Sequence, residues 1–273
     1  MRPEAGRGAW GLVVLAALAG CKHLPFASHQ PSFKPADGAD SDYKVKDSKD
    51  VARAHAEQVA VGMAFQHLQS GDPDGAEKSA RKALALNPQS TGAWTVLGLV
   101  AQQRGHAAEA GEDYRHAAEL APNDGGALNN YGAWLCANGY PAEALVWFDR
   151  ALAAPGYATP AAALANAGGC ALQTGQYERV EPDLRKALEL DPANAYALQS
   201  MARNEYRLGR YLGARAFIER RLAAAPADAG VLQLAADIET KLGDRTAASR
   251  YEQRLREEFP GATATNSGNG STP

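Results

Sequence analysis

Residues 92–124, GAWTVLGLVAQQRGHAAEAGEDYRHAAELAPND, contain the two-helix unit that decides the fold. Apolar and small residues in the first half stand at positions i, i+3, i+4 and i+7, which form one face of a helix: Trp94, Leu97, Gly98 and Ala101. We therefore expect a helix here that packs through this face.

The second half of this stretch predicts a turn and a second helix. Gly105 supplies the backbone freedom of a tight turn between helices. Ala110 and Tyr114 then begin the apolar stripe of the second helix, and Pro122 ends it because proline lacks an amide hydrogen. Gly98 and Ala110 are expected to be small because the two helix backbones approach closely there.

The same landmarks recur through the chain, separated by 34, 34, 36, 34 and 34 residues. The turn glycine recurs at Gly71, Gly105, Gly139, Gly175, Gly209 and Gly243. Five residues after each stand Ala76, Ala110, Ala144, Val180, Ala214 and Ala248. A proline follows near the end of each unit, at Pro88, Pro122, Pro155, Pro192, Pro226 and Pro260. A period of 34 residues is typical of tetratricopeptide repeats, each a pair of helices.

The repeats predict an all-α fold, a right-handed superhelical solenoid of six tetratricopeptide repeats within residues 51–262. We place them at about 57–90, 91–124, 125–160, 161–194, 195–228 and 229–262. The first helices should line a concave face. The third repeat is two residues longer, and we expect a longer loop at its end, in APGYATP. The sixth is more polar and is expected to form a cap.

The N-terminal segment resembles a lipoprotein signal peptide, expected over residues 1–20. Arg2 and Arg7 precede an apolar run of about ten residues, roughly half of what a membrane-spanning helix needs. The run ends in Leu18-Ala19-Gly20-Cys21, which resembles the bacterial lipobox and implies cleavage before Cys21 and its lipidation. The alternative is a secreted protein with a chance cysteine. Lys22 after the cysteine, by resemblance to sorted lipoproteins, favours an outer-membrane, periplasm-facing location.

The segments that flank the repeats are polar and lack periodicity. From Cys21 to about residue 50, Pro, Ser, Asp, Lys and Gly predominate, which predicts a flexible tether behind the lipid anchor. Residues 263–273 are expected to form a disordered tail.

Composition gives no support to catalysis or nucleic-acid binding. The net charge of −3 supplies no basic excess. The histidines show no metal-binding spacing, and no nucleophile or phosphate-binding loop stands in a suitable context. We expect no metal, no cofactor, no small-molecule substrate and no enzymatic activity.

Cys136 and Cys170 stand late in the first helices of repeats three and four. These helices should pack side by side, and a disulfide needs Cα atoms within about 7 Å. The pair forms either a disulfide or two buried packing thiols.

Two stretches, ALNNYGAWLCANGYPAEALVWFDRAL and ANAGGCALQTGQYERVEPDLRKALELDP, make the resemblance more specific. They are similar to the type IV pilus biogenesis lipoproteins called PilF or PilW, which combine a lipobox, a tether and six tetratricopeptide repeats. That resemblance implies a pilotin, which binds the pilus secretin subunit and promotes its outer-membrane localisation and multimerisation for pilus biogenesis and twitching motility. Val180 and Gly169 depart from the family pattern, and Gly169 is expected to alter the groove.

Two other scaffold functions remain open on the residues alone. One is a component of the machinery that inserts outer-membrane β-barrels, and the other is a scaffold for cell-wall enzyme complexes. Length and the two cysteine contexts favour the pilotin.

The expected binding residues occupy concave positions of the repeats. The first two repeats supply an apolar set, with Phe65 and Leu99 as neighbours in a trough that accepts a helix: Val61, Phe65, Leu68, Thr95 and Leu99. Repeats three and four supply Asn129, Asn130 and Asn166. Repeat five supplies Tyr196, Arg203, Tyr206 and Arg207. Packing in the inter-repeat core is the alternative for the apolar residues, and a solvated face for the charged ones.

Overall fold

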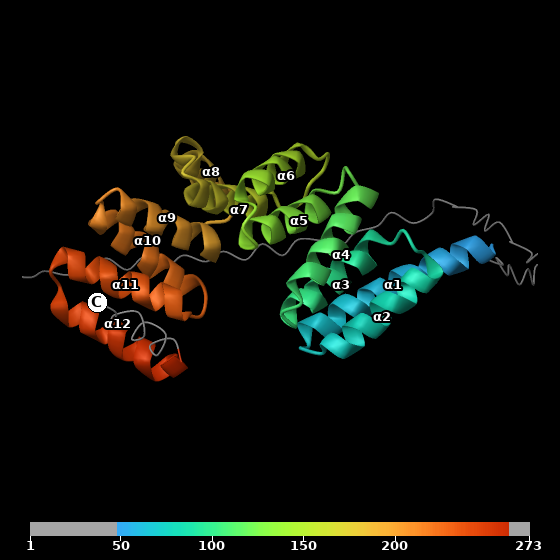
Figure 1. Ribbon diagram of the computed structural model, residues 1–273, viewed down its shortest axis with the longest axis horizontal. Helices are drawn as coiled ribbons and strands as arrows, with labels where there is room; N and C mark the ends of the chain where they lie inside the picture. Colours follow the sequence, from blue (N-terminus) through green and yellow to red (C-terminus); the bar gives the residue numbers. More distant parts are fainter. Residues whose placement is uncertain (1–47, 262–273) are drawn as a thin grey trace, which may run out of the picture. The chain divides into compact units, whose positions relative to one another are not determined.

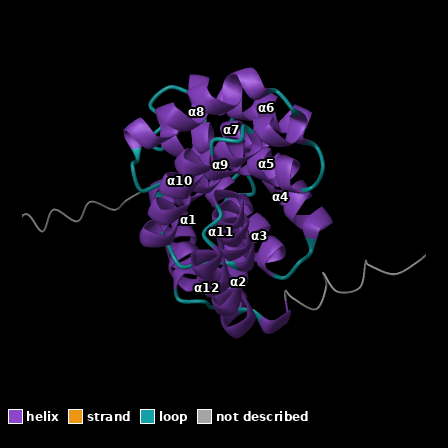
Figure 2. Ribbon diagram, turned by 90° about the vertical axis from the view of Figure 1, so that its left-hand side faces the viewer, coloured by secondary structure: helices purple, strands orange, loops and turns teal. Residues whose placement is uncertain are grey.

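The computed structural model describes residues 48–261. The expected signal peptide, the lipidation of Cys21, most of the tether and the tail lie outside the described residues. Within residues 48–261 the secondary structure is entirely helical (Figure 2). The helices are α1 (Lys49–Gln69), α2 (Pro73–Leu86), α3 (Thr91–Gln103), α4 (Ala107–Leu120), α5 (Gly125–Ala137), α6 (Pro141–Ala153), α7 (Pro160–Thr174), α8 (Tyr177–Leu190), α9 (Ala195–Arg207), α10 (Tyr211–Ala224), α11 (Ala229–Leu242) and α12 (Arg245–Glu258).

Each odd-numbered helix packs against the helix that follows it, which gives six helical hairpins (Figure 1). Successive hairpins also contact one another, and the first helices α1, α3, α5, α7 and α9 each contact the next first helix. This is the stacked-pair arrangement of a tetratricopeptide solenoid, as the period of 34 residues predicts.

The turn glycines and the helix-ending prolines act as predicted. All six turn glycines have positive φ, between 71° and 92°, a region that other residues rarely adopt. The second helix of each repeat ends two residues before its proline, for example α4 at Leu120 before Pro122. Side-chain caps start several helices, such as Asp124, which accepts from the backbone amides of Gly126 and Ala127.

Small residues on the first helices make room for side chains of the second helices and, at Gly132, for the backbone carbonyl of Ala144, 3.3 Å from a Cβ at that position. A Cβ at Gly98 would stand 2.7 Å from the ring of Tyr114 on α4. Gly132 faces Phe148 in the same way, at 2.8 Å. The second helix therefore inserts a large side chain where the first helix has none, and this is how each pair packs closely.

The first helix is longer than the predicted repeat. It begins at Lys49, eight residues before the expected start at residue 57, and Ser48 caps it by accepting from the amide of Val51. Arg53 fixes the added turns because its Nε donates to the carbonyl of Leu86, at 2.5 Å, at the end of α2. The helical repeat frame thus begins inside the segment read as tether.

The longer loop expected after the third repeat lies between α6 and α7. It contains Gly156 at φ 67°, and it places the ring of Tyr157 against Gly125. A Cβ at Gly125 would stand 2.4 Å from that ring. The longer loop therefore covers the start of α5 with the ring of Tyr157.

The core runs along the inner sides of the helix pairs. Its largest fully buried side chains include Leu128, Phe148, Leu184, Met201 and Ile218. Arginines join neighbouring repeats outside this core. Arg179 of α8 contacts Asp149 of α6 at 2.8 Å, for example, and hydrogen bonding to Asp149 raises the pKa of Arg179. Between residues 48 and 261, no helix is both long and apolar enough to cross a bilayer.

Candidate protein-binding surface

An open apolar groove of about 510 Å³ lies across α1 and α3. Phe65 and Leu68 from α1 and Leu99 from α3 supply its apolar lining, and Phe65 is 36% exposed. The remaining lining residues are three glutamines, Gln69, Gln102 and Gln103. None of the lining residues is charged, so water in the groove faces apolar carbon and neutral amides.

The glutamine rim was not singled out from the sequence. Gln102 stands at the repeat position of Leu68, and Gln69 and Gln103 stand at the next position. Gln69 and Gln103 follow Phe65 and Leu99 by one helical turn. An amide on a concave position gives no signal by itself, because glutamine is common on any exposed helix face. Only the groove shows that the three amides border one hollow.

Two of the predicted apolar contacts are less accessible than expected. Thr95 is 8% exposed and Val61 packs against the core of the first repeats, where it fills the space beside Gly92. Thr95 therefore cannot present a docking surface, which corrects its assignment.

The asparagines of repeats three and four meet in the structure. The Nδ2 atom of Asn166 on α7 donates to the Oδ1 atom of Asn129 on α5, at 3.0 Å. Asn129 is only 8% exposed, and Asn130, the next residue, is half-buried. The sequence placed these residues on neighbouring helices but did not predict their bond.

The four residues of repeat five do not form one surface, which corrects their grouping. Arg207 lies over the ring of Tyr177, 3.6 Å from its centroid, and Tyr206 packs edge-on against Tyr211. Tyr177 and Tyr211 each begin a second helix. Positions at the end of a first helix lie next to the turn, so their long side chains reach the second helices instead of the concave face.

Tyr196 and Arg203 remain available on α9. Tyr196 is 39% exposed, and its ring covers Gly169 of α7, where a Cβ would stand 2.5 Å from the tyrosine hydroxyl. Burial raises the pKa of the Tyr196 hydroxyl. Arg203 is exposed and has no carboxylate partner among residues 48–261. At the departure from the family pattern, a ring from the next repeat thus takes the volume beside Gly169.

Cys136 and Cys170 form a disulfide, with their Cα atoms 6.0 Å apart. The bond joins α5 to α7, the same two helices that the Asn129–Asn166 hydrogen bond joins. The sequence left open whether the two cysteines form a disulfide or remain buried thiols, and the structure contains the disulfide.

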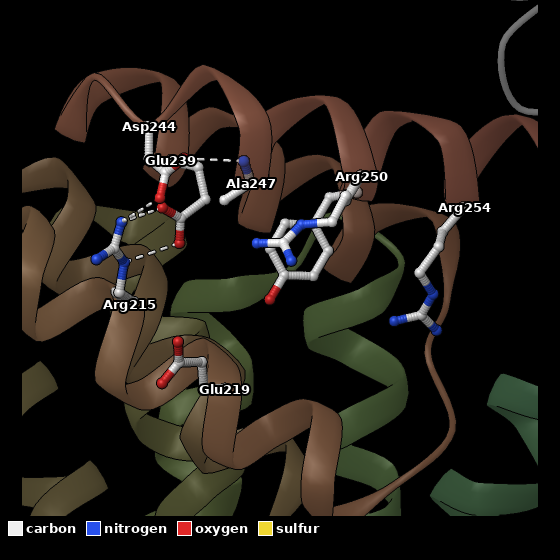
Figure 3. A pocket seen from close by; sticks show the side chains of 8 residues that line it. Arg215, Glu219, Glu239, Asp244, Ala247, Arg250 and Arg254 are labelled. Atoms are coloured by element: carbon white, nitrogen blue, oxygen red, sulfur yellow. Dashed lines mark hydrogen bonds and ion pairs between the residues drawn. The ribbon is translucent and has the colours of Figure 1, made fainter.

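A second hollow, of about 380 Å³, lies between α10 and α12 and was not predicted (Figure 3). Its lining is charged, and Figure 3 shows Arg215 directed at Glu239. Arg215 Nε donates to Glu239 at 2.8 Å, a bond that raises the pKa of Arg215, and Asp244 lies 3.9 Å away. Glu239 is 3% exposed, so this arginine compensates a buried carboxylate.

Asp113 on α4 is a half-buried carboxylate without an ion-pair partner among residues 48–261, and the charge of Arg81 offsets its burial only in part. Burial, and next the negative charge of Glu109, raise its pKa from the ordinary 3.8 to about 6. Across residues 48–261 there is no group of three or more His, Cys, Asp or Glu side chains that could hold a metal ion.

Comparison with known proteins agrees with this geometry. The family model of the tetratricopeptide repeat matches residues 91–124 and 161–194, the second and fourth predicted repeats. The type IV pilus assembly protein PilF of Pseudomonas aeruginosa is 26% identical over 213 residues, which cover 78% of this chain and 84% of PilF.

Two solved structures resemble this one over most of their length. The crystal structure of PilW, described as a widely conserved type IV pilus biogenesis factor, is 30% identical with a TM-score of 0.66. The match covers 75% of this chain and 94% of PilW. The structure of Pseudomonas aeruginosa PilF also gives a TM-score of 0.66, at 26% identity, and covers 77% of this chain and 95% of PilF.

Proposed function

Because this chain belongs to the tetratricopeptide-repeat family of type IV pilus biogenesis factors, we propose that it is a pilotin. In this role it is an outer-membrane lipoprotein that faces the periplasm and binds the secretin subunit. It carries that subunit to the outer membrane and promotes multimerisation of the pore through which the pilus emerges. Pilus biogenesis and twitching motility then depend on it.

The observation that carries this proposal is the apolar groove lined by Phe65, Leu68 and Leu99. Apolar surface that is open to water contributes about 25 cal/mol per Å² when a partner covers it. Neutral glutamines around it add hydrogen bonds without the cost of removing charges from water. The groove therefore suits the apolar face of a protein segment.

The lipobox-like motif at residues 18–21 supports the anchoring half of the proposal. Two or more acyl chains hold a protein on a membrane stably, whereas one chain does not. A helical repeat domain joined to such an anchor would hold a bound subunit at the membrane surface.

Affinity purification tests the binding half. The full-length chain, tagged at its C-terminus and extracted from membranes in detergent, is expected to co-purify a multimeric secretin. Absence of the secretin, with outer-membrane barrel-insertion proteins or cell-wall enzymes in its place, would contradict the pilotin role.

The anchoring half has a separate test in Cys21→Ser. We expect the variant to remain unprocessed or mis-sorted, with secretin multimers reduced or left in the inner membrane. A variant that still fractionates normally with the outer membrane would show that the motif is not a lipidation site.

A further inference from the structure

The turn between the two helices of repeat five exposes two leucines. Leu208 follows the last residue of α9, and Leu212 stands in the first turn of α10. Leu212 is 71% exposed, the largest exposed fraction of any large apolar side chain in residues 48–261, and Leu208 is 40% exposed. Hydrocarbon that is open to water in this way favours any surface that can cover it.

The fold does not need leucine at either position. Leu208 precedes the turn glycine by one residue, and Leu212 follows it by three. In repeats one to four the first position holds Ser70, Arg104, Asn138 and Thr174, and the second holds Asp74, Ala108, Ala142 and Glu178. Polar or small residues therefore serve the same turn in four other repeats, and the two leucines need another explanation.

The turn of repeat four lies beside these leucines and adds an aromatic ring. Tyr177 is 47% exposed, and the guanidinium of Arg207 lies 3.6 Å from its ring centroid. Arg210 also reaches repeat four, where its Nη1 atom lies 3.8 Å from a carboxylate oxygen of Glu181 on α8. The two adjacent turns thus share one surface, which we call the turn edge: Tyr177, Arg207, Leu208, Arg210 and Leu212.

The leucines of the turn edge stand among positive charges. Residues 206–212 contain Arg207 and Arg210 and no acidic residue. Arg210 is partly neutralised by carboxylates at 3.2 and 3.8 Å, whereas Arg207 has no carboxylate partner within residues 48–261. Glu178, which follows Tyr177, is exposed. Arg207 therefore retains donors for an anionic group such as phosphate.

These residue types match the interfacial region of a lipid bilayer. Leucine side chains enter the acyl layer, and tyrosine rings remain at the level of the headgroups. Arginine stems lie along apolar surface while their guanidinium groups reach the phosphates. A protein partner would need a pocket shaped for two projecting leucines, whereas a fluid acyl layer adapts to them. The turn edge therefore fits a membrane surface better than a folded partner.

The expected lipid anchor places such a surface within reach. Residues 22–47 separate Cys21 from the described repeats, and a segment of that length spans at most about 90 Å when extended. Tethering raises the effective concentration of the bilayer, so that even a weak contact forms. We propose that the turn edge binds the surface of the anchoring membrane, with Leu208 and Leu212 inserted among anionic phospholipids. This deepens the proposed function and rests on its anchoring half.

The contact would orient the repeats on the bilayer. A tether alone lets the domain turn in any direction, whereas a contact at the turns of repeats four and five fixes which side meets the membrane. The contact is weak by itself, because even a single acyl chain, which buries more hydrocarbon than two leucines, gives only marginal binding. Cys21→Ser should therefore still leave the membrane.

Fluorescence quenching tests the proposal in the lipidated full chain. Gln176→Cys, at an exposed residue of the repeat-four turn, adds one free thiol for a dye, since Cys136 and Cys170 are bonded. The labelled chain is reconstituted in vesicles of phosphatidylethanolamine and phosphatidylglycerol with bromine, a quencher, on the acyl chains near the headgroups. We expect the dye to lose about half of its fluorescence, because such contacts lie about 5–10 Å into the boundary of headgroups and acyl chains.

Two comparisons locate the contact. A dye at Gln89→Cys, in the exposed loop between α2 and α3, should be quenched little. Leu208→Ser together with Leu212→Ser should reduce the quenching at position 176 to the level at position 89, while the acyl chains keep the protein on the vesicle. Leu190→Ser is the matched control, since Leu190 is 51% exposed but ends α8, and it should leave the quenching unchanged.

Equal quenching at positions 176 and 89, or quenching at position 176 that survives the two leucine substitutions, would overturn the proposal. A C-terminal histidine tag bound to nickel-chelating lipid holds the chain on the vesicle if Cys21 is not lipidated, so the turn edge is tested in either case. In detergent, the variant without the two leucines should co-purify the secretin as the wild type does. Absence of the secretin from the wild type would overturn the pilotin role and leave the quenching result intact.

Discussion

The two ends of the solenoid each have a hollow. The two hollows differ in whether their side chains already have partners within the described protein. The groove across α1 and α3 exposes hydrocarbon from Phe65 and Leu99 that no residue between 48 and 261 covers. The hollow between α10 and α12 is lined by charges, but its buried carboxylate, Glu239, already has Arg215 as partner.

The difference concerns the cost of displacing water. Covering the groove releases water from carbon and leaves neutral amides to bond with the partner. Covering the charged hollow would remove water from ionised groups, a cost that a partner must offset with well-placed opposite charges. Hollow volume alone does not separate the two cases, whereas the chemistry of the lining does. We therefore propose binding at the first hollow and a structural role for the second.

The largest expected effect comes from the disulfide, which lies in the repeats between these two ends. Replacing both Cys136 and Cys170 by serine should lower the free energy of unfolding by about 3 to 4 kcal/mol, since the bond closes a loop with a sequence separation of 34. Chemical denaturation followed by circular dichroism measures this, and secretin binding should persist once the variant is folded. Loss of binding at the α1–α3 groove in the folded double-serine variant would show that the groove depends on the disulfide.

Mass analysis supplies the control for that prediction. The oxidised wild type should be two hydrogens lighter than the reduced form, and a reductant should destabilise the wild type but not the double-serine variant. Thiols in the oxidised protein that react readily with maleimide would mean that the bond is absent in solution.

Loss of the groove should have the next largest effect. Phe65→Asp together with Leu99→Asp is expected to weaken secretin binding by about thirtyfold or more, because charge replaces anchor residues in a desolvated pocket. Secretin co-purification and multimer formation report the loss, and the helical circular-dichroism signal should be retained.

Leu212→Asp is the matched control, since Leu212 is also apolar and 71% exposed but lies on α10. It should bind the secretin normally. A folded Phe65/Leu99 variant that still supports twitching would contradict binding at the groove. Tyr196 and Arg203 on α9 would then be the next candidate residues.

The charged hollow should respond in stability but not in binding. Arg215→Met leaves the buried Glu239 carboxylate without its partner, and we expect the melting temperature to fall by about 4 to 8 °C. Arg250→Met, in the same hollow, removes an arginine without an ion-pair partner in residues 48–261 and should leave the melting temperature unchanged. If Arg215→Met weakened secretin binding with its fold intact, the hollow would be a second binding site.

The smallest effect concerns Asp113, a half-buried carboxylate whose pKa the charge of Arg81 lowers less than burial raises it. Its pKa of about 6 in the folded protein exceeds its ordinary 3.8, so the folded state holds this proton more tightly than the unfolded chain. Its contribution to stability is therefore fully present below about pH 4 and is lost as the pH rises through 6. Asp113→Asn should stabilise the protein at pH 7 by about 1 kcal/mol, with allowance for solvent screening, and by little at pH 4.

Denaturation curves at the two pH values measure this effect. Glu252→Gln, an exposed carboxylate on α12 without an ion-pair partner among residues 48–261, is the control and should change stability at neither pH. An equal gain from Asp113→Asn at both pH values would show that its burial does not perturb the proton equilibrium.

The repeat frame was predictable because its signals are local. A turn with positive φ requires glycine, a helix end is marked by proline, and an apolar stripe at helical spacing needs only neighbouring residues. The concave residues of the early repeats followed from the same frame. The start of α1 did not, because the turns before residue 57 depend on the contact of Arg53 with the carbonyl of Leu86, which lies 33 residues away in sequence.

The sequence by itself thus determined the helix pairs, their number and the face that their first helices share. Only the tertiary structure decided which residues on that face remain free. Phe65 stays exposed, Leu99 is half-buried at the groove, Thr95 is covered, and Arg207 lies over Tyr177. The physical reason is that helical periodicity fixes the direction of a side chain from its own axis, whereas exposure and pairing depend on what the next repeat places opposite it.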